Sequence, residues 1–195
     1  MKQEFLLRVW QRRRHFLVFL TTAPLAACAS GGRLKPLPPP RPGPYVLGAG
    51  DTVRIIVFNQ KQLTDTYELD DSGTIDLPLL GVIRAAGLTT PELAQKISSR
   101  LKAGGILLYP SVAVEITRYR PFYILGEVNK PGQYPFRPGM TVLTAVSLAG
   151  GFTYRAVESY AGIVRVTHGH PHEYRAEADA LVQPGDVVKI FERHF

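Results

Sequence analysis

From residue 45 onward, short apolar runs alternate with clusters of turn-forming residues, a pattern typical of a mixed α+β fold. In the first half, strands are expected over the following apolar or alternating segments: 52–58, 74–77, 81–87 and 111–117. The sequence Asp-Asp-Ser-Gly at 70–73 favours a tight turn. The segments 67–69 and 74–77 on either side of it are therefore predicted to pair as a hairpin.

The segment before the strand at 111–117 carries the signals of one helix. Thr89 or Thr90 can cap it, Pro91 suits its first turn, and Glu92 complements the helix dipole. Its apolar positions recur every four residues and predict one buried stripe, made of Leu93, Ile97 and Leu101. Two consecutive glycines then end the helix, so the first half is α+β.

The second half, from about residue 120, predicts the order strand, turn, strand, helix, strand. The expected strands are 122–128, 133–136, 163–166 and 187–190. Turns are predicted at 130–132 and, from its Gly-His-Pro sequence, at 169–171. Thr141 caps the helix, whose inner side is expected to contain Val142, Leu143, Val146 and Ala149. This order fits a small β-grasp-like domain.

One dipeptide recurs in the two halves. Gly50-Asp51 precedes the first predicted strand, and Gly185-Asp186 precedes the last one, with a basic residue at the same offset in both strands. In both places a tight turn that leads into a core strand is expected.

The N-terminus has the pattern of a secretory signal. Residues 1–15 are basic, and the apolar run at 16–27 is too short for a membrane-spanning helix, which needs about 20 residues. Residues 25–28, Leu-Ala-Ala-Cys, resemble the lipobox of bacterial lipoproteins. The resemblance implies cleavage between Ala27 and Cys28 and acylation of Cys28. An ordinary signal peptide or a signal anchor with a chance cysteine is the alternative.

The segment that follows the cysteine is rich in proline and glycine, so residues 28–44 are predicted to be an extended tether that packs no core. The domain organisation predicted from these patterns is 1–27 signal peptide, 28–44 tether, 45–119 first domain and 120–195 second domain.

Charge and composition exclude several classes of protein. The net charge is +7, but without residues 1–27 there remain 18 basic against 15 acidic residues. With the export signal, this modest excess disfavours nucleic acid as a partner. A single Cys excludes an internal disulfide framework and a Cys-cluster zinc site.

Catalysis is not expected, because the sequence contains no Gly-x-Ser-x-Gly, P-loop or HExxH motif. Carboxylates that could form a glycosidase pair are Asp51, Asp70, Asp71, Asp76 and Glu127, but several of these adjoin Gly or Ser, as turn residues do. The histidines at 168, 170 and 172 alternate as metal ligands could, yet Gly169 and Pro171 favour a solvated hairpin tip. Neither a metal nor another cofactor is expected.

Aromatic and basic residues gather in the second half and form the candidate contact set: Arg118, Arg120, Tyr123, Arg137, Tyr154 and Arg155. Aromatic faces can stack on sugar rings, and arginine suits an acidic polysaccharide or a neighbouring subunit. Burial in the core, or at a subunit contact, is the alternative for the aromatic residues, and a solvated face is the alternative for the arginines.

Six stretches of the sequence resemble the polysaccharide export family of Wza type, with its SLBB domain. They are Tyr45-x-Leu-Gly-x-Gly-Asp-x-Val-x-Ile55, Gly73-Thr-Ile-x-Leu-Pro-Leu-Leu-Gly-Val-Ile83, Gly87-Leu-Thr-x-x-Glu-Leu93, Tyr109-Pro-x-Val-x-Val114, Leu125-Gly-Glu-Val-x-x-Pro-Gly-x-Tyr134 and Ala149-Gly-Gly-Phe152. The resemblance covers roughly residues 45–190, which is nearly all of the chain that is expected to fold.

The resemblance implies a polysaccharide export domain at 45–119, an SLBB domain at 120–195 and no enzymatic activity. It implies a lipoprotein anchored on the periplasmic face of the outer membrane, because Ala29 stands where an inner-membrane retention signal would place Asp. The implied assembly is a homo-oligomeric ring, with an octamer as one size, that conducts capsule or exopolysaccharide. Its implied partners are an inner-membrane polysaccharide co-polymerase and the polysaccharide itself.

The chain departs from longer members of this family, which add a C-terminal helix that crosses the outer membrane. No segment after Cys28 has 18 consecutive apolar residues. A separate outer-membrane β-barrel is therefore expected to provide the exit. The alternative function is a glycan- or peptidoglycan-binding periplasmic lipoprotein that transports nothing.

Overall fold

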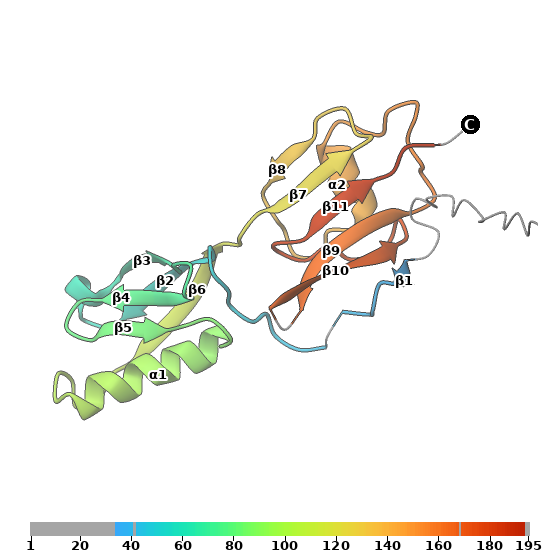
Figure 1. Cartoon of the computed structure of the whole chain (residues 1–195). Helices are drawn as coiled ribbons and strands as arrows, with labels where there is room; N and C mark the ends of the chain where they lie inside the picture. Colours follow the sequence, from blue (N-terminus) through green and yellow to red (C-terminus); the bar gives the residue numbers. More distant parts are fainter. Residues whose placement is uncertain (1–33, 41, 168, 194–195) are drawn as a thin grey trace, which may run out of the picture.

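The computed structural model describes residues 34–40, 42–167 and 169–193, which form two units with separate hydrophobic cores (Figure 1). Both units combine strands with a helix, so the α+β class predicted from the sequence is confirmed. Across the described ranges, no helix has both the length and the apolar character needed to cross a membrane.

The first unit contains a three-stranded sheet, a two-stranded hairpin and a helix. In chain order its elements are β2 (Thr52–Val57), the 3-10 helix η1 (Lys61–Leu63), β3 (Asp65–Glu68), β4 (Thr74–Leu77), β5 (Gly81–Arg84), α1 (Thr90–Ala103) and β6 (Val112–Arg118). The sheet order is β3-β2-β6, and both pairs are antiparallel. Leu93, Ile97 and Leu101 of α1 are fully buried in the same core as β2.

The start of α1 forms as its sequence predicts. The Thr89 hydroxyl accepts a hydrogen bond from the amide of Glu92, and the Glu92 carboxylate accepts one from the Thr89 amide at 2.8 Å. This capping box satisfies amide groups that the first turn leaves without helical partners.

The predicted hairpin between 67–69 and 74–77 is wrong. The turn at 70–73 exists, but β3 pairs with β2, and β4 pairs with β5. The Asp70 carboxylate accepts hydrogen bonds from the backbone amide and the hydroxyl of Thr74, both at 2.7 Å, so the turn is closed by its own side chain. The Asp70 amide also donates to the Thr74 carbonyl at 3.0 Å, but the ladder of β3 is formed with the buried strand β2.

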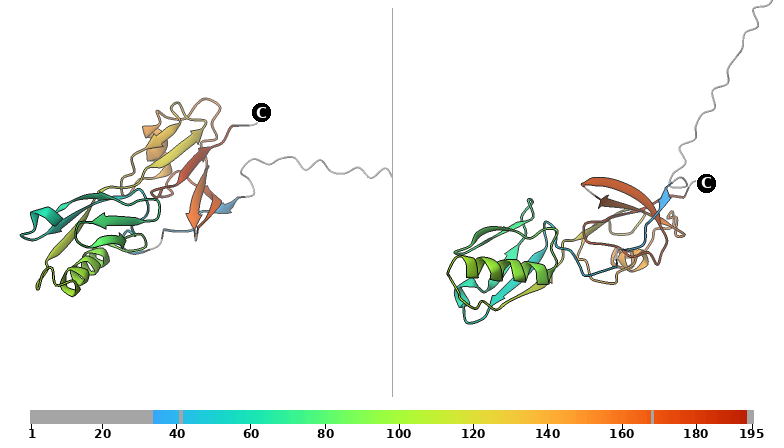
Figure 2. Two further views of the ribbon diagram at one scale, coloured as in Figure 1. Left: turned by 60° about the vertical axis from the view of Figure 1, so that its left-hand side comes forward. Right: turned by 90° about the horizontal axis from the view of Figure 1, so that it is seen from below.

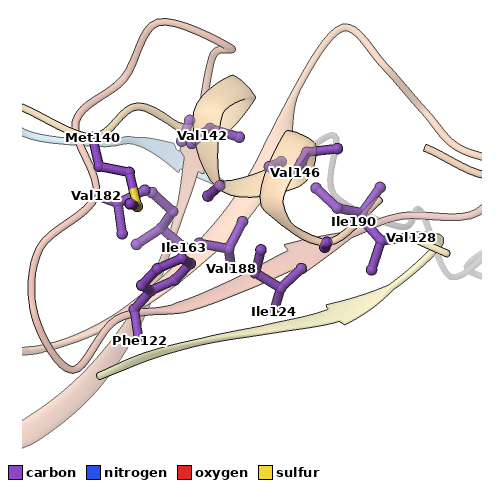
Figure 3. Packing of buried hydrophobic residues seen from close by; sticks show 14 of the residues in the cluster. Phe122, Ile124, Val128, Met140, Val142, Val146, Ile163, Val182, Val188 and Ile190 are labelled. Carbon is purple, nitrogen blue, oxygen red and sulfur yellow. The ribbon is translucent and has the colours of Figure 1, made fainter. Parts of the chain in front are cut away.

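The second unit is one six-stranded sheet with a helix against one face. Its elements are β1 (Lys35–Pro36), β7 (Phe122–Gly126), β8 (Gly132–Tyr134), α2 (Val142–Leu148), β9 (Ala161–Thr167), β10 (His170–Ala176) and β11 (Val187–Ile190). The strand order is β1-β10-β9-β11-β7-β8. Figure 3 shows side chains of β7, β9 and β11 pointing toward α2, among them Phe122, Ile163 and Val188.

Two predictions for the second unit are wrong. Leu143 is 51% exposed, and Ala145 takes the place expected for it on the buried side of α2. The strand β10 was missed because its sequence, HPHEYRA, lacks apolar alternation. It is held by a seven-residue antiparallel ladder with β9, and the reversal of the chain occurs at Gly169, where φ is +80°.

The prediction that residues 28–44 pack no core is also wrong for part of that segment. Lys35 and Pro36 pair in parallel with Tyr174 and Arg175 at the edge of β10, and Leu37 packs against the core of the second unit. The extended backbone that prolines favour matches a strand, and an edge position tolerates the missing amide of Pro36.

The turn at Asp70 gives a prediction about acid stability. Hydrogen bonds from the Thr74 hydroxyl and amide, and then from Ser72, lower the pKa of Asp70 to about 2. Because this lies below the unfolded value of about 3.9, the contribution of Asp70 is present above pH 4 and is lost as the pH falls toward 2. We expect Asp70→Asn to lower the melting temperature at neutral pH by a few degrees at most and to flatten the change between pH 4 and 2.

Thermal unfolding followed by circular dichroism across that pH range measures both effects. The matched control is Asp71→Asn, because the neighbouring carboxylate makes no hydrogen bond to the residues that the structure describes. Equal pH profiles for the two variants would contradict the role given to Asp70.

Candidate functional site

The two units meet at a turn built around a buried carboxylate. Asp51, which has no exposed surface, accepts hydrogen bonds from the amide of Gly48 at 2.8 Å and from the hydroxyl of Tyr45 at 2.7 Å. The Asp51 amide in turn donates to the carbonyl of Gly48 at 3.1 Å. Gly50 adopts φ = +83°, a conformation that favours glycine, and completes the turn.

The second Gly-Asp dipeptide repeats this turn in the other unit. Asp186, which is 1% exposed, accepts from the amide of Gln183 at 2.7 Å, and its own amide donates to the Gln183 carbonyl at 3.1 Å. Arg165 binds the Asp186 carboxylate with two hydrogen bonds, of 2.9 and 2.7 Å. The two Gly-Asp dipeptides are therefore alike in structure as well as in sequence. In each, a buried aspartate accepts a hydrogen bond from the backbone amide of the residue three positions earlier.

Arg120 lies between the two turns and contacts both. Its backbone amide and its guanidinium bind Asp51 at 2.8 and 3.3 Å, while its Nε donates to the carbonyl of Pro184 at 3.1 Å. A side chain at Gly48 would overlap the guanidinium, so the absence of one there makes room for it. The amide of Gly185 also donates to Pro121 at 2.9 Å. These bonds fix the linker, which is residues 119–121 between β6 and β7, to both units.

Aromatic rings line the same junction. Tyr45 meets Tyr119 edge to face with centroids 4.9 Å apart, and Tyr119 meets Phe136 of the second unit at 5.5 Å. Burial raises the pKa of Tyr45 above its ordinary value, so its hydroxyl stays a donor to Asp51 at any physiological pH. The rings thus close the junction on the side where the linker leaves the first unit.

The two arginines predicted as contacts near the linker are both engaged within the chain. Arg120 forms the junction described above. Arg118 pairs with Glu68 at 2.9 Å, and both side chains are more than half exposed. Ala27 and Cys28 lie outside the described residues.

The remaining candidate contacts do not gather at one place. Tyr123 is 43% exposed on the sheet face away from α2, and Arg137 is exposed in the segment between β8 and α2. Tyr154 is 88% exposed, and Arg155 forms an ion pair with Glu192, which follows the end of β11. Since the junction contacts the residues just before β11, the whole of that strand separates Arg155 from the linker.

The residues considered for catalysis or metal binding either form hydrogen bonds that stabilise the fold or are exposed. Asp51 and Asp70 hold turns, and the Glu127 carboxylate accepts a hydrogen bond from Thr153. His170 and His172 are exposed on β10, and His168 is outside the described residues. Among residues 34–40, 42–167 and 169–193, no group of three or more His, Cys, Asp or Glu could hold a metal ion.

Sequence reasoning missed an exposed apolar surface at the end of the first unit farthest from the linker, which we call the distal tip. The side chains are 69–94% exposed and belong to Phe58, Leu79, Leu108 and Tyr109. They lie at one end because the Phe58 amide bonds Ser111 at the start of β6, while Arg100 in the last turn of α1 bonds Val82 beside the β4–β5 turn. In the sequence, this surface is indicated by large apolar residues that stand within turn segments, where polar residues are usual.

From the junction, we expect Arg120 and Arg118 to contribute unequally to the free energy of unfolding. Arg120→Met should lower the free energy of unfolding by roughly 1–3 kcal/mol, because it removes a donor from a fully buried carboxylate. Arg118→Met is the matched control and should cost less than about 1 kcal/mol, because its ion pair is exposed. Urea unfolding of the two variants measures the difference, and equal losses would contradict the importance of the junction.

Two regions of the chain match known protein families. Residues 39–117 match the family described as polysaccharide biosynthesis/export protein, and residues 121–174 match the SLBB domain. The exopolysaccharide production protein ExoF of Rhizobium meliloti (strain 1021) is 38% identical over 144 residues, which cover 68% of this chain and 33% of ExoF.

Two further relatives are more distant. The EPS I polysaccharide export outer membrane protein EpsA of Ralstonia solanacearum is 27% identical over 186 residues, which cover 77% of this chain and 48% of EpsA. The polysialic acid transport protein KpsD of Escherichia coli is 26% identical over 112 residues, which cover 55% of this chain and 19% of KpsD. The chain thus spans about a third of ExoF and about half of EpsA.

Both domain matches fall on the two units in the order that the sequence motifs predicted. The family is one of transport components and not of enzymes. The chain belongs to the polysaccharide biosynthesis/export family, with an export domain followed by an SLBB domain.

Proposed function

We propose that the protein is a periplasmic lipoprotein of the outer membrane that forms a ring-shaped conduit for capsule or exopolysaccharide. The observation that carries the proposal is the consecutive match of the export domain, over residues 39–117, and the SLBB domain, over residues 121–174. The relative EpsA is named an outer membrane export protein, which supports the same location.

The anchor in this proposal is Cys28. The sequence Leu25-Ala26-Ala27-Cys28 follows a basic and then an apolar segment, as a lipoprotein signal requires. Cleavage after Ala27 and acylation of Cys28 with two or more chains would give stable anchoring, since a single chain binds membranes only marginally.

Two features of the fold support assembly into a ring. The Arg120 junction holds the two units of each copy in one arrangement, and repeated copies need a constant shape to close around an axis. The distal tip offers Leu108 and Tyr109, which are 75% and 94% exposed, to a neighbouring copy or to a further component. The further components of the proposal are an inner-membrane co-polymerase and a separate exit protein in the outer membrane.

The test compares the lipidated protein with a Cys28→Ser variant. Mass spectrometry should find acyl chains on Cys28 of the unchanged protein, and the variant should lose them and its membrane association. Native mass measurement and negative-stain images of the detergent extract should then show a closed ring with a central opening, alone or after addition of the periplasmic domain of the co-polymerase.

Two results would contradict the proposal. A monomer that stays monomeric with the co-polymerase domain, and that binds oligosaccharide, would favour the alternative of a glycan- or peptidoglycan-binding lipoprotein. Large channels opened in bilayers by the purified protein alone would contradict the need for a separate exit protein.

A further inference from the structure

The export domain has a long strand edge that is open. In the sheet order β3-β2-β6, the seven-residue strand β6 pairs with β2 on one side and with no strand of the described chain on the other. The amide and carbonyl of Val57, which lies opposite Val112, are bonded to the Thr64 hydroxyl at 3.0 and 3.3 Å. Because ladder bonds alternate along an antiparallel pair, the backbone groups that point away from β2 are those of Val112, Val114 and Ile116.

Other edges of the described sheets are short or already occupied, as is usual in proteins that avoid pairing with further chains. The amide of Thr66 in β3 is bonded to the carboxylate of Asp65 at 2.7 Å, and two of the four β3 residues are acidic. Lys96 and Arg100 of α1 each bond a carbonyl of β5 at 2.9 Å. The part of β10 that β1 leaves uncovered, 170–173, contains a proline and a charged residue, and β1, β4 and β8 have four residues or fewer. Of these edges, β6 alone is both long and unprotected.

A groove lies beside this edge, between β6 and α1. In the view from below in Figure 2, α1 lies across the strands of the export domain. Its flank beside the groove presents Thr90, Ala94 and Ser98, and the strand contributes residues 112–114. The Ser98 hydroxyl donates to the carbonyl of Pro110 at 3.2 Å and fixes this wall. None of the described residues that line the groove is charged, so it suits an uncharged strand better than a charged chain.

We propose that β6 pairs with β6 of a second copy, antiparallel and with Val114 on a two-fold axis. In this register Val114 meets its own equivalent and Val112 meets Ile116, so all three outward residues of each copy are used. Ala113 then meets Glu115, which keeps the glutamates of the two copies from facing each other directly. A second copy is the occupant that the chain itself offers, because only another β6 is an equally long and open edge among the described strands.

This pairing goes beyond the proposed ring and does not depend on it. A two-fold contact uses the same patch on both copies and is complete with two, whereas a ring needs two different patches on each copy. The pair therefore covers β6 in copies that stand outside a larger assembly. An open edge in such copies would be a site of aggregation, and pairing removes it.

The register is tested with single cysteines in the full chain carrying Cys28→Ser, which removes the one natural thiol. Directly opposed residues have Cα atoms about 5.5 Å apart in a hydrogen-bonded pair, a separation that a disulfide can bridge. Val114→Cys should therefore give a disulfide-linked dimer on mild oxidation. The matched control is Ala113→Cys, because its Cα atoms in the two copies are two residues out of line and roughly 8 Å apart, beyond the reach of a disulfide.

A mixture of Ala113→Cys and Glu115→Cys tests the same register from the other face of the sheet. Each variant alone should stay unlinked, and the mixture should form the mixed dimer, because these two positions lie opposite each other in the proposed pair. Mass spectrometry without reductant identifies which chains are linked.

Amide exchange measures the contact without a substitution in β6. At protein concentrations where sedimentation shows a dimer, the amides of Val112, Val114 and Ile116 should exchange roughly tenfold more slowly than in the monomer. The amides of Ala113 and Glu115 point toward β2, should exchange equally in both states and serve as the internal control.

Three results would overturn the proposal. They are a chain that stays monomeric at every concentration, equal cross-linking at positions 113 and 114, and a dimer in which the Val114 amide exchanges as fast as in the monomer. Protection of that amide only after the periplasmic domain of the co-polymerase is added would assign the edge to a strand of another protein instead. Ring formation is measured on the lipidated protein, so failure of the ring and failure of this pair are distinguishable.

Discussion

The arrangement of the whole chain depends on one arginine between two buried aspartate turns. Arg120 binds Asp51 of the export domain and the Pro184 carbonyl of the SLBB domain, so one side chain bonds both domains where they meet. Separating a buried carboxylate from its partners is unfavourable, because an unpaired charge that is shielded from water has a high free energy. The linker between β6 and β7 is thereby fixed at both ends, although each domain has a core of its own.

The chain crosses between the domains at a second place, after residues 34–40, which pair with the edge of β10. The linker at Arg120 is held by a charged pair with the buried Asp51. Residues 34–40 are held by a short strand and by the half-buried Leu37, so theirs is the weaker of the two attachments.

Elements with local signals could be predicted from the sequence, and those that depend on distant partners could not. Thr89, Glu92 and the stripe ending at Leu101 are all within one helix, so periodicity and capping were enough. The pairing of β3 with β2, and of β1 with β10, depends on which edge is free in the folded domain, and β propensity carries no such information. For the same reason the Gly-Asp repeat was visible in the sequence, but the arginines that bind the two aspartates were not.

The structure also shows that most of the candidate arginines are paired within the chain. Arg118, Arg120, Arg155 and Arg165 are each paired with a carboxylate of the same chain. Of the candidate arginines, Arg137 alone has no side-chain partner among the described residues, so the other three are not free guanidinium groups. The exposed tyrosines at 123 and 154 lie on different parts of the SLBB domain and do not form one binding surface.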